Sequence, residues 1–265
     1  MTGSRFPLLY PIDERFFDAL GPAQAWLVGL FAADGCVRGD RLATISQSGE
    51  HGFRLLQHVQ HMLGHRAPIR TWKQAHTITI TSATMVDFLK RFHVVERKSH
   101  IYKYPESMPP DLAAPFLRGY IDGDGCVGVY DNGRGVKSLL VSYFGTTEFI
   151  QRSVIDIPSS VRVRASKKCP GMSEARANGR HAIRFGRWLW SDTSLPRHSK
   201  QDIYDRYMSV ATPRYLRYEP LRDQAEHLFK LGLAPMQVAR EIGLSCQTVW
   251  RWKEQYAASR HPRSG

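Results

Sequence analysis

Alternating apolar and polar residues predict short β-strands in both halves of the chain. A period of two, typical of a strand with one buried face, runs through TITIT (77–81) and VRVRAS (161–166). Further strand-like segments are RLATISQ (41–47), APIRTW (67–72), VKSLLVSYFG (136–145) and HAIRFG (181–186). Helical segments lie between them at 50–63, 83–92 and 146–155, and a shorter WLW segment closes the second half. Each half reads helix, two strands, helix, two strands, helix, which predicts an α+β unit duplicated in tandem.

The duplication is clearest in an eleven-residue motif. LVGLFAADGCV begins at Leu27, and LRGYIDGDGCV begins 90 residues later at Leu117. The two are identical at their first and third positions and over the closing Asp-Gly-Cys-Val. Pro22 and Pro115 can occupy the first turns of the two motif helices. We expect repeats at residues 1–105 and 106–212, related by a pseudo-twofold axis.

Glycines inside and after the motif helices predict how these helices pack. Gly29 and Gly119 lie in mid-helix, where glycine costs about 1 kcal/mol relative to alanine. That cost is understandable if two helix backbones approach closely there. Gly35 and Gly125 follow the helices and are expected to adopt the left-handed conformation that ends a helix. The motif helices are thus predicted to form the seam between the halves.

Asp34 and Asp124 would emerge side by side where the two helices end. Helix C-termini carry partial negative charge and free carbonyls, so two carboxylates placed there repel each other and the helix dipoles. A divalent cation relieves this conflict, since carboxylate, carbonyl and water oxygens are ligands suited to Mg²⁺. One Asp-Gly pair is usually only a turn. Two pairs in matched contexts favour a shared metal site.

The paired motifs resemble the LAGLIDADG signature, in its single-chain form with two motifs, over roughly residues 20–210. The resemblance implies that the motif helices form the domain interface and that two four-stranded sheets make a saddle over the DNA major groove. It also implies that Asp34 and Asp124 bind the catalytic Mg²⁺, with Ala33 and Gly123 supplying backbone oxygens. Mn²⁺ is expected to substitute for Mg²⁺, and Ca²⁺ to bind without supporting cleavage.

The resemblance further implies a basic residue near each catalytic centre. Lys98, in the segment ERKSH (96–100), is the candidate in the first half. The segment PRHSK (196–200) places His198 opposite Lys98, with Lys200 two residues further on, and both stay candidates for the second centre. The first motif departs from the second in having Ala32 where the second has Asp122, a position expected to play a supporting role.

Net charge points to a polyanionic partner. Lys and Arg number 37 against 24 Asp and Glu, a formal charge of +13. Residues 151–217 alone hold 14 basic and 5 acidic residues. This excess favours nucleic acid over a membrane surface, although a merely basic protein remains an alternative. Without an 18-residue apolar run, zinc-type cysteine spacing or a signal-like N-terminus, we expect a cytoplasmic protein, encoded by a bacterium or phage.

Polar residues on the predicted sheet faces are candidates for contact with double-stranded DNA. Arginine can read guanine and glutamine can read adenine in the major groove, while each residue taken singly could equally contact phosphate or solvent. The candidates are Arg38, Arg41, Ser46, Gln47, Arg70, Lys73, Gln74, Thr77, Thr79, Arg134, Lys137, Arg162, Arg164, Ser166, Arg180, Arg184 and Arg187.

The C-terminal region predicts a separate all-α module. A linker is expected at 213–220, followed within 221–265 by helices near 221–231, 235–242 and 246–257. Ala239, Gly243 and Val249 have the spacing of a helix-turn-helix. Ser245 could cap the last helix, whose Gln247, Thr248 and Arg251 would face DNA. An ordinary helical hairpin is the alternative.

The resemblance, together with the net charge, implies a site-specific homing endonuclease. It would make a metal-dependent double-strand break in a long asymmetric DNA target, as a monomer with no obligate protein partner. A catalytically inactive DNA-binding regulator is one alternative, because sporulation regulators combine a LAGLIDADG-like domain with a helix-turn-helix. An intron RNA maturase is another. The presence of both Asp34 and Asp124 favours the nuclease.

Overall fold

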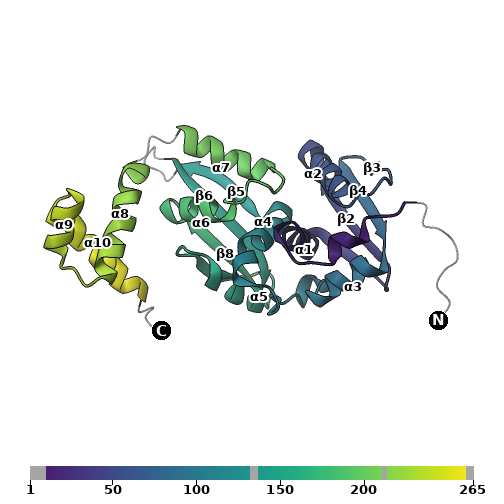
Figure 1. Ribbon diagram of the computed structural model, residues 1–265, viewed down its shortest axis with the longest axis horizontal. Coiled ribbons are helices and arrows are strands. Elements are labelled where there is room, and N and C mark those ends of the chain that lie inside the picture. Colours follow the sequence, from purple (N-terminus) through teal and green to yellow (C-terminus); the bar gives the residue numbers. More distant parts are fainter. Residues whose placement is uncertain (1–9, 132–136, 211–213, 261–265) are drawn as a thin grey trace. The chain divides into compact units, whose positions relative to one another are not determined.

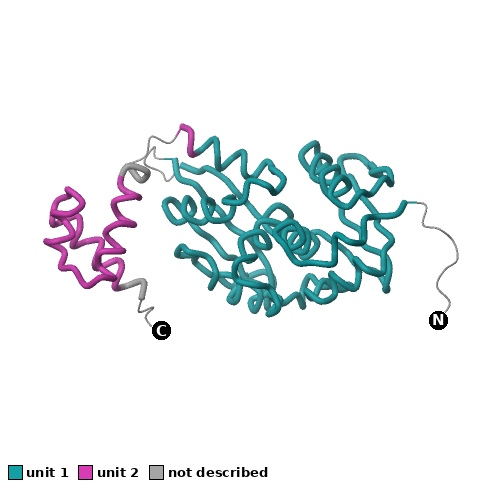
Figure 2. The backbone as a smooth tube through the Cα atoms, viewed as in Figure 1, with its two compact units in different colours: residues 1–207 teal, residues 208–265 magenta. Residues whose placement is uncertain are grey.

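The chain divides into two compact units, residues 1–207 and 208–265 (Figure 2). The structure, a computed structural model, describes residues 10–131, 137–210 and 214–260, and the side chains of all these except 214–217 and 258–260. Within these ranges no helix is long and apolar enough to cross a membrane.

Unit 1 contains the duplicated α+β arrangement that the sequence predicts. The first half comprises α1 (Pro22–Asp34), β1 (Gly35–Arg38), β2 (Leu42–Ser48), α2 (Gly49–Met62), β3 (Arg70–Trp72), β4 (Ala75–Thr81) and α3 (Ala83–Arg91). The second half comprises α4 (Ala113–Asp124), β5 (Cys126–Asp131), β6 (Lys137–Thr146), α5 (Thr147–Ser153), β7 (Arg162–Ala165), β8 (Met172–Asn178) and α6 (Arg180–Leu189), followed by α7 (Ser199–Val210). The tandem αββαββα prediction is confirmed.

Each half folds into a four-stranded antiparallel sheet that carries its helices on one face. The strand orders, β1-β2-β4-β3 and β5-β6-β8-β7, are equivalent. In β4, Ile78 and Ile80 are buried while the threonines that alternate with them, at positions 77, 79 and 81, stay partly exposed, as strand alternation requires. The sheets lie on either side of the central pair α1 and α4 (Figure 1). One face of each sheet is therefore left open.

The seam between the halves is a direct contact of helix backbones. A Cβ atom on Gly29 would lie 1.9 Å from the carbonyl oxygen of Phe116, and one on Gly119 would lie 1.9 Å from that of Trp26. Any side chain at either position would force the helices apart. The close approach predicted from these two glycines is confirmed, and it is nearly symmetric.

Gly35 and Gly125 are required for a different reason from the one predicted. Both residues are extended, with φ of −80° and −78°, so the prediction that they adopt the left-handed conformation is wrong. A Cβ on Gly35 would lie 2.7 Å from the Phe31 carbonyl oxygen, and one on Gly125 would lie 2.6 Å from that of Ile121. The chain passes directly from helix to strand, and only glycine fits against the last helical turn.

The segment HAIRFG is helical, not a strand. Ala182, Ile183, Phe185 and Leu189 are buried at a spacing that forms one face of α6, and this face packs on β6 and β8. The fourth strand of the second sheet is instead β8, whose sequence MSEARAN has small, weakly apolar residues at its buried positions. In so short a segment, the spacing of apolar residues fits both the two-residue period of a strand and the 3.6-residue period of a helix. Packing against the sheet selects the helix.

Unit 2 is a small bundle of three helices, α8 (Arg214–Lys230), α9 (Pro235–Ile242) and α10 (Cys246–Arg260). The linker expected at 213–220 is wrong from residue 214 onward, because α8 already begins there and contains Pro220. Tyr218 and Leu221 pack on the core formed by Ala225, Val238 and Val249 among others, which explains the early start. Gly243 adopts φ of +67° between α9 and α10, and Ser245 Oγ accepts a hydrogen bond from the Thr248 amide.

The helix seam gives a stability prediction. Gly29→Ala or Gly119→Ala should destabilise unit 1 by about 3 kcal/mol or more, because the new methyl group must displace backbone rather than a flexible side chain. Gly128→Ala, at a strand position where a Cβ meets nothing within 4 Å, is the matched control and should change stability by less than about 0.5 kcal/mol. Thermal unfolding followed by circular dichroism measures both. Equal melting temperatures for the three variants would contradict the packing argument.

Candidate active site at the helix seam

Asp34 and Asp124 meet where α1 and α4 end. Asp34 is partly buried and Asp124 exposed, and the two carboxyl groups lie within hydrogen-bonding reach. Burial, followed by the charge of Asp124, raises the pKa of Asp34 to about 6. The structure thus brings together the two residues that the sequence predicted to be adjacent. The raised pKa reflects the burial of Asp34 first, and the repulsion expected between the two neighbouring carboxylates second.

A lysine approaches each helix end from outside the motif. Buried Lys98 donates through Nζ to the carbonyl of Gly35 and, at 3.5 Å, to that of Ala33. Lys200 Nζ donates to the carbonyls of Ile121, Asp122 and Gly123 at 2.6, 2.9 and 2.7 Å. Each ammonium group neutralises the negative end of one helix dipole. The two lysines are therefore equivalent in the two halves.

Lys200, not His198, is the structural counterpart of Lys98. The alignment that placed His198 opposite Lys98 is wrong, because the loop before α7 is longer than the one after α3. Burial, followed by the charge of Lys200, lowers the pKa of His198 to about 4, so this imidazole is neutral at pH 7. Its Nδ1 faces the main-chain amide of Lys200 at 3.4 Å. His198 supports the segment that positions Lys200 and does not reach the carboxylate pair through any hydrogen bond found among the described residues.

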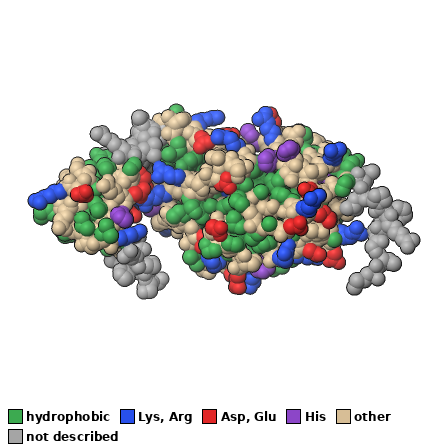
Figure 3. Space-filling model, in the orientation of Figure 1, with side chains coloured by type: hydrophobic (Ala, Val, Ile, Leu, Met, Phe, Trp, Pro, Cys, Tyr) green, Lys and Arg blue, Asp and Glu red, His purple; other side chains and the backbone are tan. Residues whose placement is uncertain are grey.

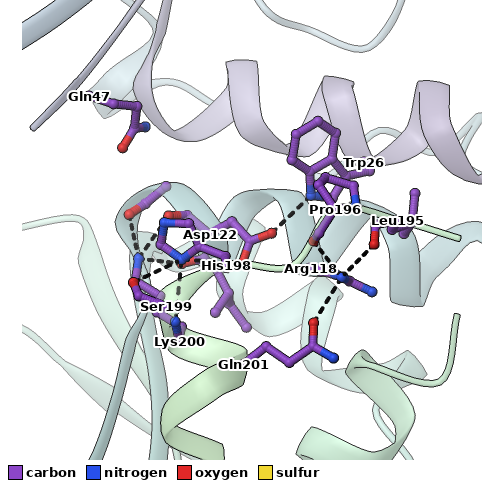
Figure 4. Close-up of polar contacts among 12 residues, drawn as sticks. Trp26, Gln47, Arg118, Asp122, Leu195, Pro196, His198, Ser199, Lys200 and Gln201 are labelled. Atoms are coloured by element: carbon purple, nitrogen blue, oxygen red, sulfur yellow. Dashed lines mark hydrogen bonds and ion pairs between the residues drawn. The ribbon is translucent and has the colours of Figure 1, made fainter. Parts of the chain in front are cut away.

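Asp122 lies in a polar network that is buried behind the site (Figure 4). Trp26 Nε1 donates to Asp122 Oδ2 at 2.9 Å across the seam. Burial raises the pKa of Asp122 to about 6. Arg118 lies close by and donates to Gln201 Oε1 at 3.0 Å and to the Pro196 carbonyl at 2.6 Å, which ties the segment before α7 to the motif helix. The supporting role expected for Asp122 stays a prediction.

Gln47 contacts the carboxylate pair at the helix seam. Its Nε2 donates to Asp34 Oδ2 at 2.5 Å, and this hydrogen bond opposes the rise in the pKa of Asp34. The sequence placed Gln47 among the base-reading candidates because it lies on a predicted strand. Its position at the end of β2, just before the helix N-terminus at Gly49, is what directs it to the seam.

The carboxylate pair suits a hard divalent cation. Its donors are carboxylate oxygens, which Mg²⁺ prefers. The carbonyls of Ala33 and Gly123, which were also expected to bind the cation, accept hydrogen bonds from Lys98 and Lys200. No third His, Cys, Asp or Glu joins the pair within the described residues. A cation there would depend on water and on a ligand phosphate to complete its coordination, as Mg²⁺ commonly does. The residues present therefore fit the expected metal.

Most predicted recognition residues lie on the strands or their connections. Ser46 and Thr77 share a face of the first sheet and are joined through their hydroxyl groups at 2.8 Å, and Thr79 follows on the same face. Ser166 is half-buried just after β7. The exposed candidates are Arg38, Arg41, Arg70, Lys73, Gln74, Lys137, Arg162 and Arg164. Arg134 lies outside the described residues.

Three predicted recognition residues are not on a sheet. Arg180, Arg184 and Arg187 belong to α6, which packs on the helix-bearing face of the second sheet, so they do not share the open face with Arg162 and Arg164. On the molecular face shown in Figure 3, basic and acidic side chains are interspersed. That view shows no continuous basic surface. The open faces of the two sheets stay the predicted surfaces for DNA contact.

In unit 2, the predicted recognition helix is α10. Gln247 and Arg251 are exposed on it, and Thr248 is half-buried. Val249 and Trp252, also on α10, are buried in the core of the unit. Val249 and Trp252 thus form the core of the unit, whereas Gln247 and Arg251 do not pack in it.

Comparison with known proteins identifies the fold. No family model and no curated protein matches the sequence. Among solved structures, the chain is similar to the meganuclease I-SmaMI bound to uncleavable DNA, with 10% identity over 76% of this chain and 92% of that one and a TM-score of 0.54. It is similar to the LAGLIDADG homing endonuclease I-GzeII in complex with its DNA target (10% identity, 76% and 92%, TM-score 0.51) and to the LAGLIDADG meganuclease I-AabMI bound to uncleaved DNA (14%, 85% and 99%, 0.51). The chain therefore has the fold of the LAGLIDADG homing endonucleases.

Proposed function

We propose that the protein is a site-specific, metal-dependent DNA endonuclease that cuts both strands of a long asymmetric target. The observation that carries this proposal is the meeting of Asp34 and Asp124 at the ends of two packed helices, each with a lysine beside it. The DNA-bound structures of similar fold and the net charge of +13 support double-stranded DNA as the partner. Two unlike halves in one chain favour a monomer on an asymmetric site.

The carboxylates and the lysines have distinct parts in this chemistry. Asp34 and Asp124 would hold Mg²⁺, which when bound supplies positive charge to the reacting phosphate. Lys98 and Lys200 are held at the seam, where their ammonium groups offset negative charge that develops on the phosphate oxygens. Burial lowers the pKa of both lysines. Gln47 fixes the orientation of the Asp34 carboxylate.

A DNA-binding regulator without cleavage is the principal alternative, and the carboxylates distinguish the two. A regulator needs neither acid, and placing both at helix C-termini is unfavourable for folding. Their retention in that position favours catalysis. A maturase would use the same surface for RNA, and a comparison of RNA with duplex DNA of the same sequence separates these functions.

The first prediction of the proposed function concerns the carboxylates. Asp34→Asn or Asp124→Asn should reduce double-strand cleavage by at least about 100-fold, while binding is retained, because the charge that holds the metal is lost but the DNA surface is not. A target is first selected from a randomised-site library with and without Mg²⁺. Cleavage of a plasmid carrying that site and gel-shift binding are then measured for each variant.

Asp87→Asn is the matched control, since it removes one negative charge from an exposed position on α3. It should cut at the wild-type rate. Full cleavage by the Asp34 or Asp124 variant would exclude the proposed centre, and sequence-specific binding without cleavage by the wild type would favour the regulator.

The second prediction concerns pH. In the metal-free folded protein the pKa of Asp34 is raised from its ordinary 3.8 to about 6, so the folded state holds an extra proton between these values and loses stability as pH rises through them. Asp34→Asn should therefore stabilise the metal-free protein by about 1–2 kcal/mol at pH 8 and have little effect below pH 4. Mg²⁺ should raise the melting temperature of the wild type at pH 8 more than at pH 5. Melting curves of variant and wild type at each pH isolate the contribution of Asp34, and a variant equally stable at pH 8 would contradict it.

The third prediction concerns unit 2. Residues 218–265 hold seven basic and five acidic residues, so charge alone gives this unit weak affinity for DNA. Its contribution should come from tethering and from a few contacts on α10. Gln247→Ala with Arg251→Ala should weaken binding about 10-fold or more and shorten the footprint on one flank only, while cleavage at high protein concentration is spared.

Glu254→Ala, at another exposed position on α10, is the control and should not change the footprint. Ending the chain at residue 210, after α7, should have a larger effect in the same direction than the double substitution. An unchanged footprint would show that unit 2 serves the fold or a protein partner. A truncated protein that binds normally but does not cut would overturn the division of roles.

A further inference from the structure

The second strand of each half, β2 or β6, has a different residue at its last position but one. In the first half β2 ends at Ser48, the residue before α2, and in the second half β6 ends at Thr146, the residue before α5. Counting back one residue makes Gln47 and Gly145 equivalent. The pairing of β1 with β2 and of β5 with β6 gives the same correspondence.

This difference leaves only one carboxylate with an amide partner from that position. Gln47 donates to Asp34 at 2.5 Å, whereas Gly145 has no side chain with which to reach Asp124. A larger residue does not fit there, because a Cβ on Gly145 would lie 3.1 Å from Tyr120 Oη and 2.7 Å from Phe149 Cδ1. The space used by Gln47 in the first half is thus occupied by aromatic side chains in the second.

Tyr120 and Leu30, which are equivalent in the two motifs, explain why one half has a glutamine and the other a glycine at this strand position. Tyr120 Oη donates to the Phe144 carbonyl at 2.8 Å, which fixes the hydroxyl against the strand beside Gly145. The corresponding residue of the first motif, 90 positions earlier, is Leu30, which has no hydroxyl. The halves therefore contain two alternative pairs, Leu30 with Gln47 and Tyr120 with Gly145. The two catalytic centres therefore differ chemically, because only the Asp34 carboxylate has an amide donor from this strand position.

From this asymmetry, and resting on the nuclease function proposed above, we infer that the two strands are cut in a fixed order, with the Asp34 centre acting first. Gln47 is a positioning residue that holds the Asp34 carboxylate in one orientation, so less reorganisation is needed there before reaction. Asp124 is more exposed and receives no amide from the equivalent position. The double-strand break then passes through a nicked duplex. Each step is a hydrolysis, in which water adds OH to phosphorus, one P–O bond breaks, and the leaving oxygen receives the remaining proton.

The test measures the two strands separately. A duplex carrying the selected target is labelled at a different end on each strand, and single-turnover rates are followed for the full-length protein with Mg²⁺. The wild type should cut one strand several-fold faster than the other. Gln47→Ala should slow that faster strand by about 10-fold and leave the slower one within about 2-fold, because one positioning hydrogen bond is lost at one centre. Gln57→Ala, an exposed position on α2, is the matched control and should behave as wild type.

A second measurement does not depend on cleavage. Binding of Mn²⁺ alone, followed by electron paramagnetic resonance, should weaken by several-fold in Gln47→Ala and stay unchanged in Gln57→Ala, since an unrestrained Asp34 carboxylate holds a cation less well. Equal strand rates in the wild type, equal slowing of both strands by Gln47→Ala, or an unaltered Mn²⁺ isotherm would each overturn the inference. If neither strand is cut, the nuclease proposal fails, and the Mn²⁺ isotherm still decides whether Gln47 positions Asp34.

Discussion

The contact between the backbones of α1 and α4 at Gly29 and Gly119 is the constraint on which the rest of unit 1 depends. Asp34 and Asp124 each lie five residues beyond the crossing glycine, which is about 7.5 Å along a helix. Equal spacing on two closely packed helices brings the two ends to the same level, where the carboxyl groups meet. A wider seam would separate them. The glycines therefore determine the geometry of the site although they touch no ligand.

That geometry is unfavourable for folding. Two carboxylates share the negative ends of two helix dipoles, and burial raises the pKa of Asp34 to about 6. Lys98 and Lys200 offset part of this conflict by donating to helix-end carbonyls, one at each helix. Clustered like charges that structure alone would avoid are typical of functional sites. The packed helices and the buried network around Arg118 supply the stability that such an arrangement requires.

The sequence predicted the features that have a signal within a short segment. It missed those that depend on loop lengths and on packing between distant segments. The repeated motif, the mid-helix glycines and the strand alternation of 77–81 each carry their own signal, and the structure agrees with them. The equivalence of Lys98 with Lys200 is hidden, because the separation between matched residues grows from 90 at the motifs to 98 at Gln47 and 102 at the lysines as loops lengthen. The conformation of Gly35 and Gly125 depends on their close approach to the preceding helix, and the helical state of HAIRFG depends on its packing against the sheet. Both are set by tertiary packing, which a short segment of sequence does not reveal.

The differences between the halves occur as compensated pairs. Trp26 and Asp122 form a hydrogen bond across the seam, and the positions related to them by the 90-residue repeat are Phe116 and Ala32, which need none. An indole without its acceptor, or a buried carboxylate without its donor, would cost about 1–3 kcal/mol, so the members of each pair are constrained to change together. Leu30 with Gln47 and Tyr120 with Gly145 differ in the same paired way near Asp34 and Asp124. A symmetric dimer would have to place every such change in both halves at once. A single chain is free of that requirement, and its two centres can acquire different properties while the glycine contact holds them in one place.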